Sequence, residues 1–405
     1  MCPVQWVAPQ KYKHQANSSM PFSQAELSDA VVFHHSIPGY QPTPLRLLPQ
    51  LANHLGVGAI MIKDESYRFG LNSFKALGCS YTMGRYLSRL VDPSSHGCLS
   101  FTDIRSARDR SVLGEITFVT ATDGNHGRGV AWAAKMLGHK AVVYLSKGAA
   151  AARLWAIREL GAEATVTDLN YDDAGRHAAE QAERHGWVLV QDTAWDGYTE
   201  IPGWIMQGYA TVMAEAIGQQ KELGIERPTH ILLQAGVGSF AGAAAAAALS
   251  SGAGYDPKII IVEPDQADCF YRSALAGDGR PHAVTGELAT IMAGLACGEP
   301  NPIAWNLLRD HADCFVSCSD DVAATGMRIL GNPLNSDPRV VAGESGAATM
   351  GFLYAVLTSQ KMRELRERLS LGPDSRVLLV STEGDTDPAN YRHVVWEGAY
   401  PAAEW

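Results

Sequence analysis

Short runs of apolar, mostly β-branched residues alternate along the chain with stretches whose apolar positions recur at helical spacing. Gly-rich or polar turns separate these elements. Strands that are apolar on both faces and alternate with helices are typical of parallel sheets covered by helices on both sides. The sequence therefore predicts an α/β fold built from two open, twisted, mostly parallel sheets. The predicted strands are 60–63, 116–120, 141–145, 164–167, 230–233, 258–262 and 377–380, and the predicted helices are 73–90, 130–137, 150–160, 171–185, 240–249 and 266–276.

The length of the chain predicts two domains. Its 405 residues exceed the size at which a single hydrophobic core stops growing. Several compact β-α units between residues 115 and 190 predict a small α/β domain at 89–195. The rest of the chain, 1–88 together with 196–405, predicts a large domain built from both ends of the sequence.

The net charge and the spacing of the cysteines argue against several classes of binding partner. A formal net charge of -10 argues against general affinity for nucleic acid or acidic lipid. No signal peptide and no apolar stretch long enough to span a bilayer is visible, so we expect a cytoplasmic protein. The seven cysteines include no C-x-x-C pair, which predicts unpaired thiols and no metal site.

Lys75 ends the motif Asn72-Ser73-Phe74-Lys75, which follows Gly70 and opens a predicted helix. An amine forms an imine with an aldehyde only after losing its proton, and a partly desolvated pocket near a cationic group favours that loss. Asn and Ser can cap the helix start and leave the lysine pointing into a cleft. By itself the motif is more typical of a solvated lysine on a helix face, and only the motifs that follow favour the imine.

The second motif, Ala121-Thr122-Asp123-Gly124-Asn125-His126-Gly127, directly follows a predicted strand. A Gly-rich turn before a helix presents several backbone N–H groups to one anion. Thr122, Asp123, Gly124 and Asn125 are therefore candidates for binding a substrate carboxylate. The Asn125 amide could also reach a phenolic oxygen on a cofactor ring. A tight turn with satisfied polar groups is the alternative.

The third motif runs from Gln234 to Gly242, between a predicted strand and an Ala-rich helix. Its glycines permit close approach of the backbone to a phosphate, and its amides and a serine hydroxyl can bind one. The motif also satisfies the G-x-G-x-x-[GA] dinucleotide fingerprint, with Glu263 where a ribose-binding acid would lie. A nicotinamide-dependent oxidoreductase is thus an open alternative. The candidate phosphate ligands are Gly236, Val237, Gly238 and Ser239.

The fourth motif, Ser381-Thr382-Glu383-Gly384-Asp385-Thr386-Asp387, follows the last predicted strand. A hydroxyl at the carboxyl end of a strand, such as that of Thr382, could face a pyridine nitrogen. A neutral partner would leave that nitrogen without a full positive charge. An acidic surface turn is the alternative.

Taken together and in this order, the four motifs resemble those of the tryptophan synthase β and threonine dehydratase group, the pyridoxal 5′-phosphate (PLP) enzymes of fold type II. The resemblance covers most of the chain from Tyr40 onward. It implies that PLP lies in the cleft between the domains and is held by Lys75 as an imine. It also implies a homodimer. The residues it assigns to the cofactor are Phe74, Lys75, Asn125, Gly236, Val237, Gly238, Ser239 and Thr382.

Within that group the strings 70–78, 122–132, 191–195 and 382–387 resemble the diaminopropionate ammonia-lyase family. Asp123 replaces the Ser or Thr usual in dehydratases. A substrate with an ammonium on its β carbon needs a carboxylate that a serine site does not, and Asp123 and Asp192 are the candidates. We hypothesise that Lys75 removes the Cα proton of the L-isomer and that Asp192 assists the departing amine. The resemblance implies that Asp123 is the base for the D-isomer.

A serine or threonine dehydratase remains the main alternative, and a PLP-binding protein without activity a weaker one. Two further residues have open roles. His126 could be a ligand or base, although a structural histidine in the loop is the simpler interpretation. Glu344 could line the cofactor pocket or only begin a helix, where acidic residues are favoured.

Overall fold

A computed structural model describes residues 3–9, 20–94, 97–109 and 112–402. Its larger sheet has the strand order β1-β10-β9-β8-β11-β3-β2. The five central strands are parallel, and the two edge strands pair antiparallel with their neighbours. The strands are β1 (Val4–Val7), β2 (Leu45–Leu47), β3 (Ala59–Asp64), β8 (His230–Gln234), β9 (Lys258–Pro264), β10 (Cys314–Cys318) and β11 (Arg376–Ser381).

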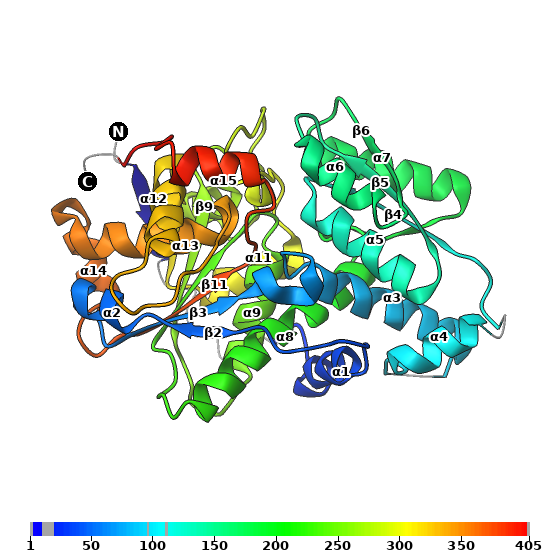
Figure 1. Cartoon of the computed structure of the whole chain (residues 1–405), viewed down its shortest axis with the longest axis horizontal. Helices are drawn as coiled ribbons and strands as arrows, with labels where there is room; N and C mark the ends of the chain where they lie inside the picture. Colours follow the sequence, from blue (N-terminus) through cyan, green and yellow to red (C-terminus); the bar gives the residue numbers. More distant parts are fainter. Residues whose placement is uncertain (1–2, 10–19, 95–96, 110–111, 403–405) are drawn as a thin grey trace.

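The smaller sheet has the order β6-β5-β4-β7, and every pair in it is parallel. Together with its helices it forms the cyan and green body on the right of Figure 1. The predicted α/β fold with two mostly parallel sheets is confirmed. The strands are β4 (Thr117–Thr122), β5 (Lys140–Leu145), β6 (Glu163–Val166) and β7 (Val188–Leu189).

Helices cover both faces of each sheet, as the apolar runs predicted. The main helices are α1 (Gln24–His35), α2 (Pro49–Leu55), α3 (Ala76–Val91), α4 (Phe101–Asp109), α5 (Asn125–Leu137), α6 (Ala151–Arg158), α7 (Tyr171–His185), α8 (Glu200–Glu222), α9 (Ser239–Leu249), α10 (Cys269–Ala276), α11 (Pro302–His311), α12 (Asp320–Gly331), α13 (Glu344–Thr358), α14 (Arg363–Leu369) and α15 (Pro388–Val395). Short 3-10 helices are η1 (Glu65–Gly70), η2 (Ala293–Leu295) and η3 (Gln360–Met362).

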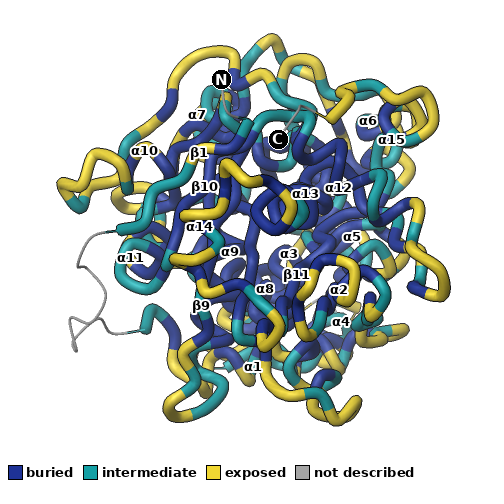
Figure 2. Tube along the Cα trace, turned by 90° about the vertical axis from the view of Figure 1, so that its left-hand side faces the viewer, coloured by how far each residue is buried: buried dark blue, intermediate teal, exposed yellow. Residues whose placement is uncertain are grey.

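Two hydrophobic cores lie on opposite faces of the larger sheet. Successive side chains of a strand point to opposite faces, so Leu233 packs into one core and its neighbour Leu232 into the other. The first core includes residues of α3, α8, α9 and α11, and the second includes residues of α2, α12, α13 and α14. Figure 2 shows the buried interior as a continuous dark region inside exposed turns.

Helix α3 connects the two sheets, because it packs against α8 of the larger body and α5 of the smaller one. The predicted boundary at residue 88 falls inside this helix. The division into 1–88 plus 196–405 and 89–195 therefore stays a prediction. Within the described ranges, no helix combines the length and the apolar character needed to cross a membrane.

Candidate active site

Lys75 lies at the point where the chain leaves η1 and enters α3, at the N-cap of that helix. The preceding turn is fixed to the end of β11. The Phe74 amide donates to the Thr382 carbonyl at 3.3 Å, and the Gly384 amide donates to the Asn72 carbonyl at 3.1 Å. Asn72 has a φ of 58°, a left-handed conformation that asparagine tolerates better than most residues. This geometry directs the lysine into a cavity between the sheets.

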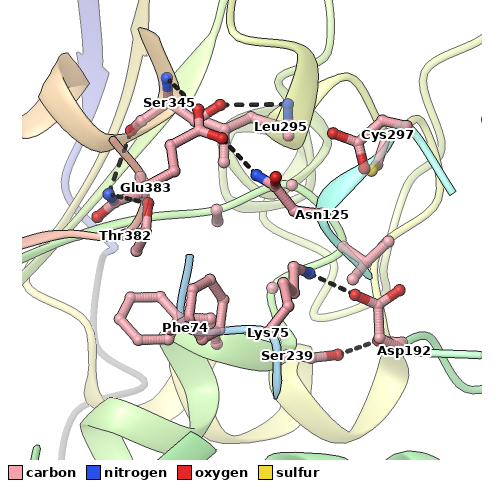
Figure 3. A pocket seen from close by; sticks show the side chains of 18 of the residues that line it. Phe74, Lys75, Asn125, Asp192, Ser239, Leu295, Cys297, Ser345, Thr382 and Glu383 are labelled. Carbon is pink, nitrogen blue, oxygen red and sulfur yellow. Dashed lines mark hydrogen bonds and ion pairs between the residues drawn. The ribbon is translucent and has the colours of Figure 1, made fainter. Parts of the chain in front are cut away.

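The Lys75 ammonium forms an ion pair with Asp192, at 2.5 Å from Nζ to Oδ2 (Figure 3). The Tyr171 hydroxyl donates to the other carboxylate oxygen at 2.6 Å. Burial alone would raise the pKa of Asp192, but His126, Lys75 and the hydrogen bonds from Lys75 and Tyr171 hold it below its usual range. Asp192 is therefore an anion at neutral pH.

A carboxylate lies directly beside Lys75. Burial lowers the pKa of the Lys75 amine, but the Asp192 and Asp123 carboxylates together outweigh burial and raise the pKa above its ordinary value. In the cofactor-free state the amine is thus protonated and hydrogen-bonded. A cationic neighbour would favour the free amine, whereas the Asp192 carboxylate holds the amine in its charged form.

A cavity that is partly open to solvent surrounds this ion pair. Most of the predicted site residues line it, although they come from distant parts of the sequence. These are Phe74, Lys75, Asp123, Asn125, Asp192, Gly236, Val237, Gly238, Ser239 and Thr382. Thr122 and Gly124 do not line it. The Thr122 hydroxyl accepts from the Gly124 and Gly127 amides at 2.8 and 2.9 Å, so it shapes the loop.

The turn Gly236–Ser239 fits a phosphate. It immediately precedes α9, and the backbone amides of Gly236, Val237 and Gly238 have no hydrogen-bond partner among the described residues. A Cβ on Gly236 would lie 3.0 Å from Leu295 Cα, and Gly238 has a φ of +87°. Unpaired amides at a buried helix N-terminus are a typical anion site. Side chains at Gly236 or Gly238 would crowd this turn, whereas an anion can occupy it. We call Gly236–Ser239 the anion cradle.

Polar groups on the opposite wall fit the ring of a cofactor. The Gln234 amide donates to the Thr382 hydroxyl at 2.9 Å, while Gln234 Oε1 is buried without a hydrogen-bond partner. The Asn125 amide donates to Glu383, and the Ser345 backbone amide donates to the same carboxylate at 3.1 Å. Figure 3 shows the side chains of Asn125, Thr382 and Glu383 across the cavity from Lys75.

Several lining residues escaped the sequence analysis as site residues. Gln234 and Glu383 lie at the carboxyl ends of strands that meet at one edge of the sheet, and this placement could have indicated them. Tyr171 begins α7 and packs with Val237 and Cys297. No local motif distinguishes Tyr171 or Cys297, because only the tertiary fold brings them to the cavity.

The sequence left the roles of three residues open, and the structure gives their positions and contacts. The Glu263 carboxylate accepts from the Phe270 and Tyr271 amides at 2.8 and 2.7 Å, so it anchors the start of α10 and does not face a nucleotide. The His126 ring is buried; it bonds the Val190 carbonyl at 2.8 Å, and its Nδ1 lies 3.6 Å from Asp192 Oδ2. Glu344 begins α13 and lines a neighbouring cavity.

The described residues contain no group of three or more His, Cys, Asp or Glu side chains able to hold a metal ion. The six cysteines that the structure describes are unpaired, and Cys2 lies outside the described residues. The site is therefore built from one lysine, several carboxylates and an anion-binding turn.

Comparisons with known proteins agree with this arrangement. The family of pyridoxal-phosphate dependent enzymes matches residues 37–383. The diaminopropionate ammonia-lyase of Escherichia coli K12 is 53% identical over 383 residues, which is 94% of each chain. The holo crystal structure of the Escherichia coli enzyme superposes with a TM-score of 0.91 at 50% identity and covers 99% of this chain and 98% of that one.

A threonine dehydratase of Salmonella typhimurium is more distant, at 25% identity over 80% of this chain and 54% of its own length. The nicotinamide alternative is wrong: the family match identifies PLP as the cofactor, and Glu263 is occupied in capping a helix. The chain belongs to the diaminopropionate ammonia-lyase family of PLP-dependent enzymes.

Proposed function

We propose that this protein eliminates ammonia from 2,3-diaminopropionate, giving pyruvate and two molecules of ammonia. The observation that carries the proposal is the Lys75–Asp192 ion pair, held inside a cavity that also contains Asp123 and the Gly236–Ser239 anion cradle. Family membership supports the same activity. When bound, PLP joins the substrate amine through its aldehyde and withdraws electrons from the α carbon.

Lys75 would hold the cofactor aldehyde in the resting enzyme and act as a base toward the substrate. Its side chain is only 15% exposed, so the amine is largely shielded from bulk water. Asp192 accepts a hydrogen bond from the amine at 2.5 Å and so would orient it for proton transfer to and from the substrate.

Binding of the substrate carboxylate is assigned to the loop before α5. The backbone amides of Asn125 and His126 have no hydrogen-bond partner among the described residues. They lie at the N-terminus of a 13-residue helix, where partial positive charge favours an anion. This orientation would leave the β carbon of the substrate toward the carboxylates of the cavity.

Asp123 and Asp192 would select the β-ammonium of diaminopropionate against the hydroxyl of serine. A buried carboxylate forms a charge-assisted hydrogen bond with an ammonium, which a neutral hydroxyl cannot match. A hydroxyl substrate would offer these carboxylates only a neutral hydrogen-bond donor. This is the physical reason to prefer an ammonia-lyase to a serine or threonine dehydratase.

The test is a comparison of kcat/KM for diaminopropionate and serine, together with Lys75→Ala. We expect diaminopropionate to be preferred by about 10²-fold or more. Lys75→Ala should lose turnover and the visible absorbance of lysine-bound PLP. Lys135→Ala, an exposed lysine of α5, is the control and should keep both. A Lys75→Ala protein with the original band and turnover, or a preference for serine, would refute the proposal.

We also propose a cytoplasmic homodimer, with the domain division described above. The family resemblance supports the dimer, and the unpaired state of the six described cysteines suits a reducing compartment. Sedimentation equilibrium of the purified holoenzyme would test the dimer directly. A single species with the 43.5 kDa mass of one chain at micromolar concentration would contradict it.

A further inference from the structure

A second cavity adjoins the first. It encloses about 1520 Å³, including space open to solvent, and is lined by residues of the smaller body, the segment 286–296 and the start of α15. Asp123 and Tyr171 line both cavities. Asp123 therefore stands at the junction between the site around Lys75 and the outer cavity.

Arg153, in the first turn of α6, reaches this junction from the outer side. Its side chain is 7% exposed and lies across Gly124, where a Cβ would meet Arg153 Cδ at 2.6 Å. Arg153 Nη1 donates to the Asp123 carbonyl at 3.2 Å and is 3.5 Å from carboxylate oxygen Oδ2. The guanidinium thus contacts both the backbone and the side chain of Asp123.

The same Asp123 oxygen, Oδ2, is buried and accepts no hydrogen bond, so its lone pairs are free to take a proton. Burial raises the pKa of Asp123, while Arg153 and Lys75 oppose that rise. Glu383 and Asp192 add to the rise. The other ionisable groups that interact with Asp123 are Tyr171, Tyr209 and Cys297.

Two cations stabilise the Asp123 carboxylate, but only one of them keeps its charge throughout turnover. The Lys75 ammonium is bonded to Asp192 and must lose its proton to act as a base. Arginine keeps its charge at every pH at which the protein is folded. During turnover Arg153 is therefore the lasting source of positive charge beside Asp123.

We propose that Arg153 is a positioning residue that keeps Asp123 ionised and fixed in place, and so sets the acid limit of turnover for D-2,3-diaminopropionate but not for the L-isomer. This rests on the proposed role of Asp123 as the base for the D-isomer. The L-isomer then serves as an internal control in the same protein, because its base is Lys75.

The experiment measures kcat/KM for both isomers as a function of pH in wild type, Arg153→Met, Arg153→Lys and Arg153→Gln. Loss of an opposite charge at this distance should move the acid limb for the D-isomer upward by about one pH unit or more, with the L-isomer limb unmoved. Arg153→Lys should restore most of the shift. Arg153→Gln replaces the Met variant if that one does not fold. Lys147→Met, an exposed cation of the outer cavity, is the matched control and should shift neither limb.

A second readout needs neither cofactor nor turnover. Infrared difference spectra of the cofactor-free protein report a protonated carboxylic acid, and the band missing from Asp123→Asn belongs to Asp123. In Arg153→Met this band should persist to a pH about one unit higher than in wild type. An unmoved band, or equal shifts for both isomers, or the same shift in Lys147→Met, would overturn the inference.

The two proposals fail in different ways. If Asp123→Asn reduces kcat/KM equally for both isomers, Asp123 is not the D-specific base and the proposed function of that residue is wrong. If Asp123→Asn is selective for the D-isomer while Arg153→Met leaves the D-isomer limb in place, only the role of Arg153 is wrong.

Discussion

Two buried groups of charged side chains, one around Arg68 and one around Lys75, are built differently. The Arg68 cluster consists of Lys63, Glu65, Arg68 and Glu215, and it lies between β3, η1 and α8. The Lys75 cluster consists of Lys75, Asp123, Arg153 and Asp192, and it lines the two cavities.

In the Arg68 cluster the guanidinium is bonded on both edges. Arg68 Nη1 and Nη2 donate to the two Glu215 oxygens at 2.8 and 2.9 Å. Nε and Nη2 donate to the two Glu65 oxygens at 2.9 and 2.8 Å. Lys63 adds an ion pair to Glu215 at 2.6 Å. Such bidentate pairs fix geometry as well as charge, so this cluster holds the segment that leads to Lys75.

The Lys75 cluster is incomplete by comparison. Within the described part of the chain, Asp123 Oδ2 and Arg153 Nε are buried without a hydrogen-bond partner, and the nearby amides of Gly236, Val237 and Gly238 are also unpaired. Buried polar atoms are normally satisfied, so the unpaired ones around this cavity are available to a ligand. The Arg68 cluster fixes the local structure. The Lys75 cluster keeps unpaired hydrogen-bonding atoms available to cofactor and substrate.

The largest expected effect is a loss of stability when the Arg68 cluster is broken. Arg68→Met leaves Glu65 and Glu215 as buried carboxylates, which should cost about 3 to 5 kcal/mol of unfolding free energy. Urea denaturation of the cofactor-free protein measures this. Lys140→Met breaks the exposed pair with Glu115 and should change the unfolding free energy very little. Similar losses in the two variants would remove the distinction between the Arg68 cluster and a surface ion pair.

A smaller effect, on the catalytic rate, is expected from a change in the Lys75 cluster. Asp192→Asn removes the acceptor beside Lys75 and should lower kcat/KM about 10²-fold for both isomers, near 2.7 kcal/mol. Steady-state assays of pyruvate formation measure it. Asp196→Asn changes an exposed carboxylate in the same segment and should leave the rate unchanged. A wild-type rate in Asp192→Asn would exclude a proton-transfer role.

The smallest effect concerns Glu344 at the edge of the outer cavity. Burial and the charge of Glu383 raise its pKa from 4.5 to about 7. A raised carboxyl pKa means that the folded state binds the proton more tightly than the unfolded state. The resulting stability is fully present below the unfolded pKa and is lost as the pH rises from about 4.5 to 7. Glu344→Gln should remove on the order of 1 to 3 kcal/mol of this pH dependence.

Unfolding free energies at pH 4.5 and pH 8, in wild type and in Glu344→Gln, test the prediction. Glu287→Gln, another acid of the outer cavity that is exposed, is the control and should change the difference little. An identical pH dependence in wild type and Glu344→Gln would show that Glu344 titrates normally.

Much of the fold was predictable because parallel strands buried on both faces form apolar runs. The strands missed from the sequence were β1, β2, β7 and β10. β1, β2 and β7 are short and lie at sheet edges, where little apolar sequence is needed. β10 is fully buried but reads CFVSC, and its cysteines and serine hide the β-branched pattern used to find the others.

The sequence could predict those parts of the candidate site that lie in loops directly after strands. The structure brings Lys75, Asp123 and Gly236 into one cavity, as the order of the motifs suggested. The bonding inside the cavity was not predictable, because the partner of Lys75 is 117 residues away and sequence alone fixes no distance between them. The role of Arg153 was hidden for the same reason, since α6 approaches Asp123 only in the folded chain.

The attachment of the Lys75 turn to β11 has a consequence for how the protein is made. β11 lies in the interior of the larger sheet, between β8 and β3, yet it follows the other strands of both sheets in the sequence. Until it emerges from the ribosome, the sheet has a gap and the turn at Asn72 has nothing to bind. Long-range pairing of this kind is slow to form, so a nascent chain stays unable to capture cofactor until β11 has been made.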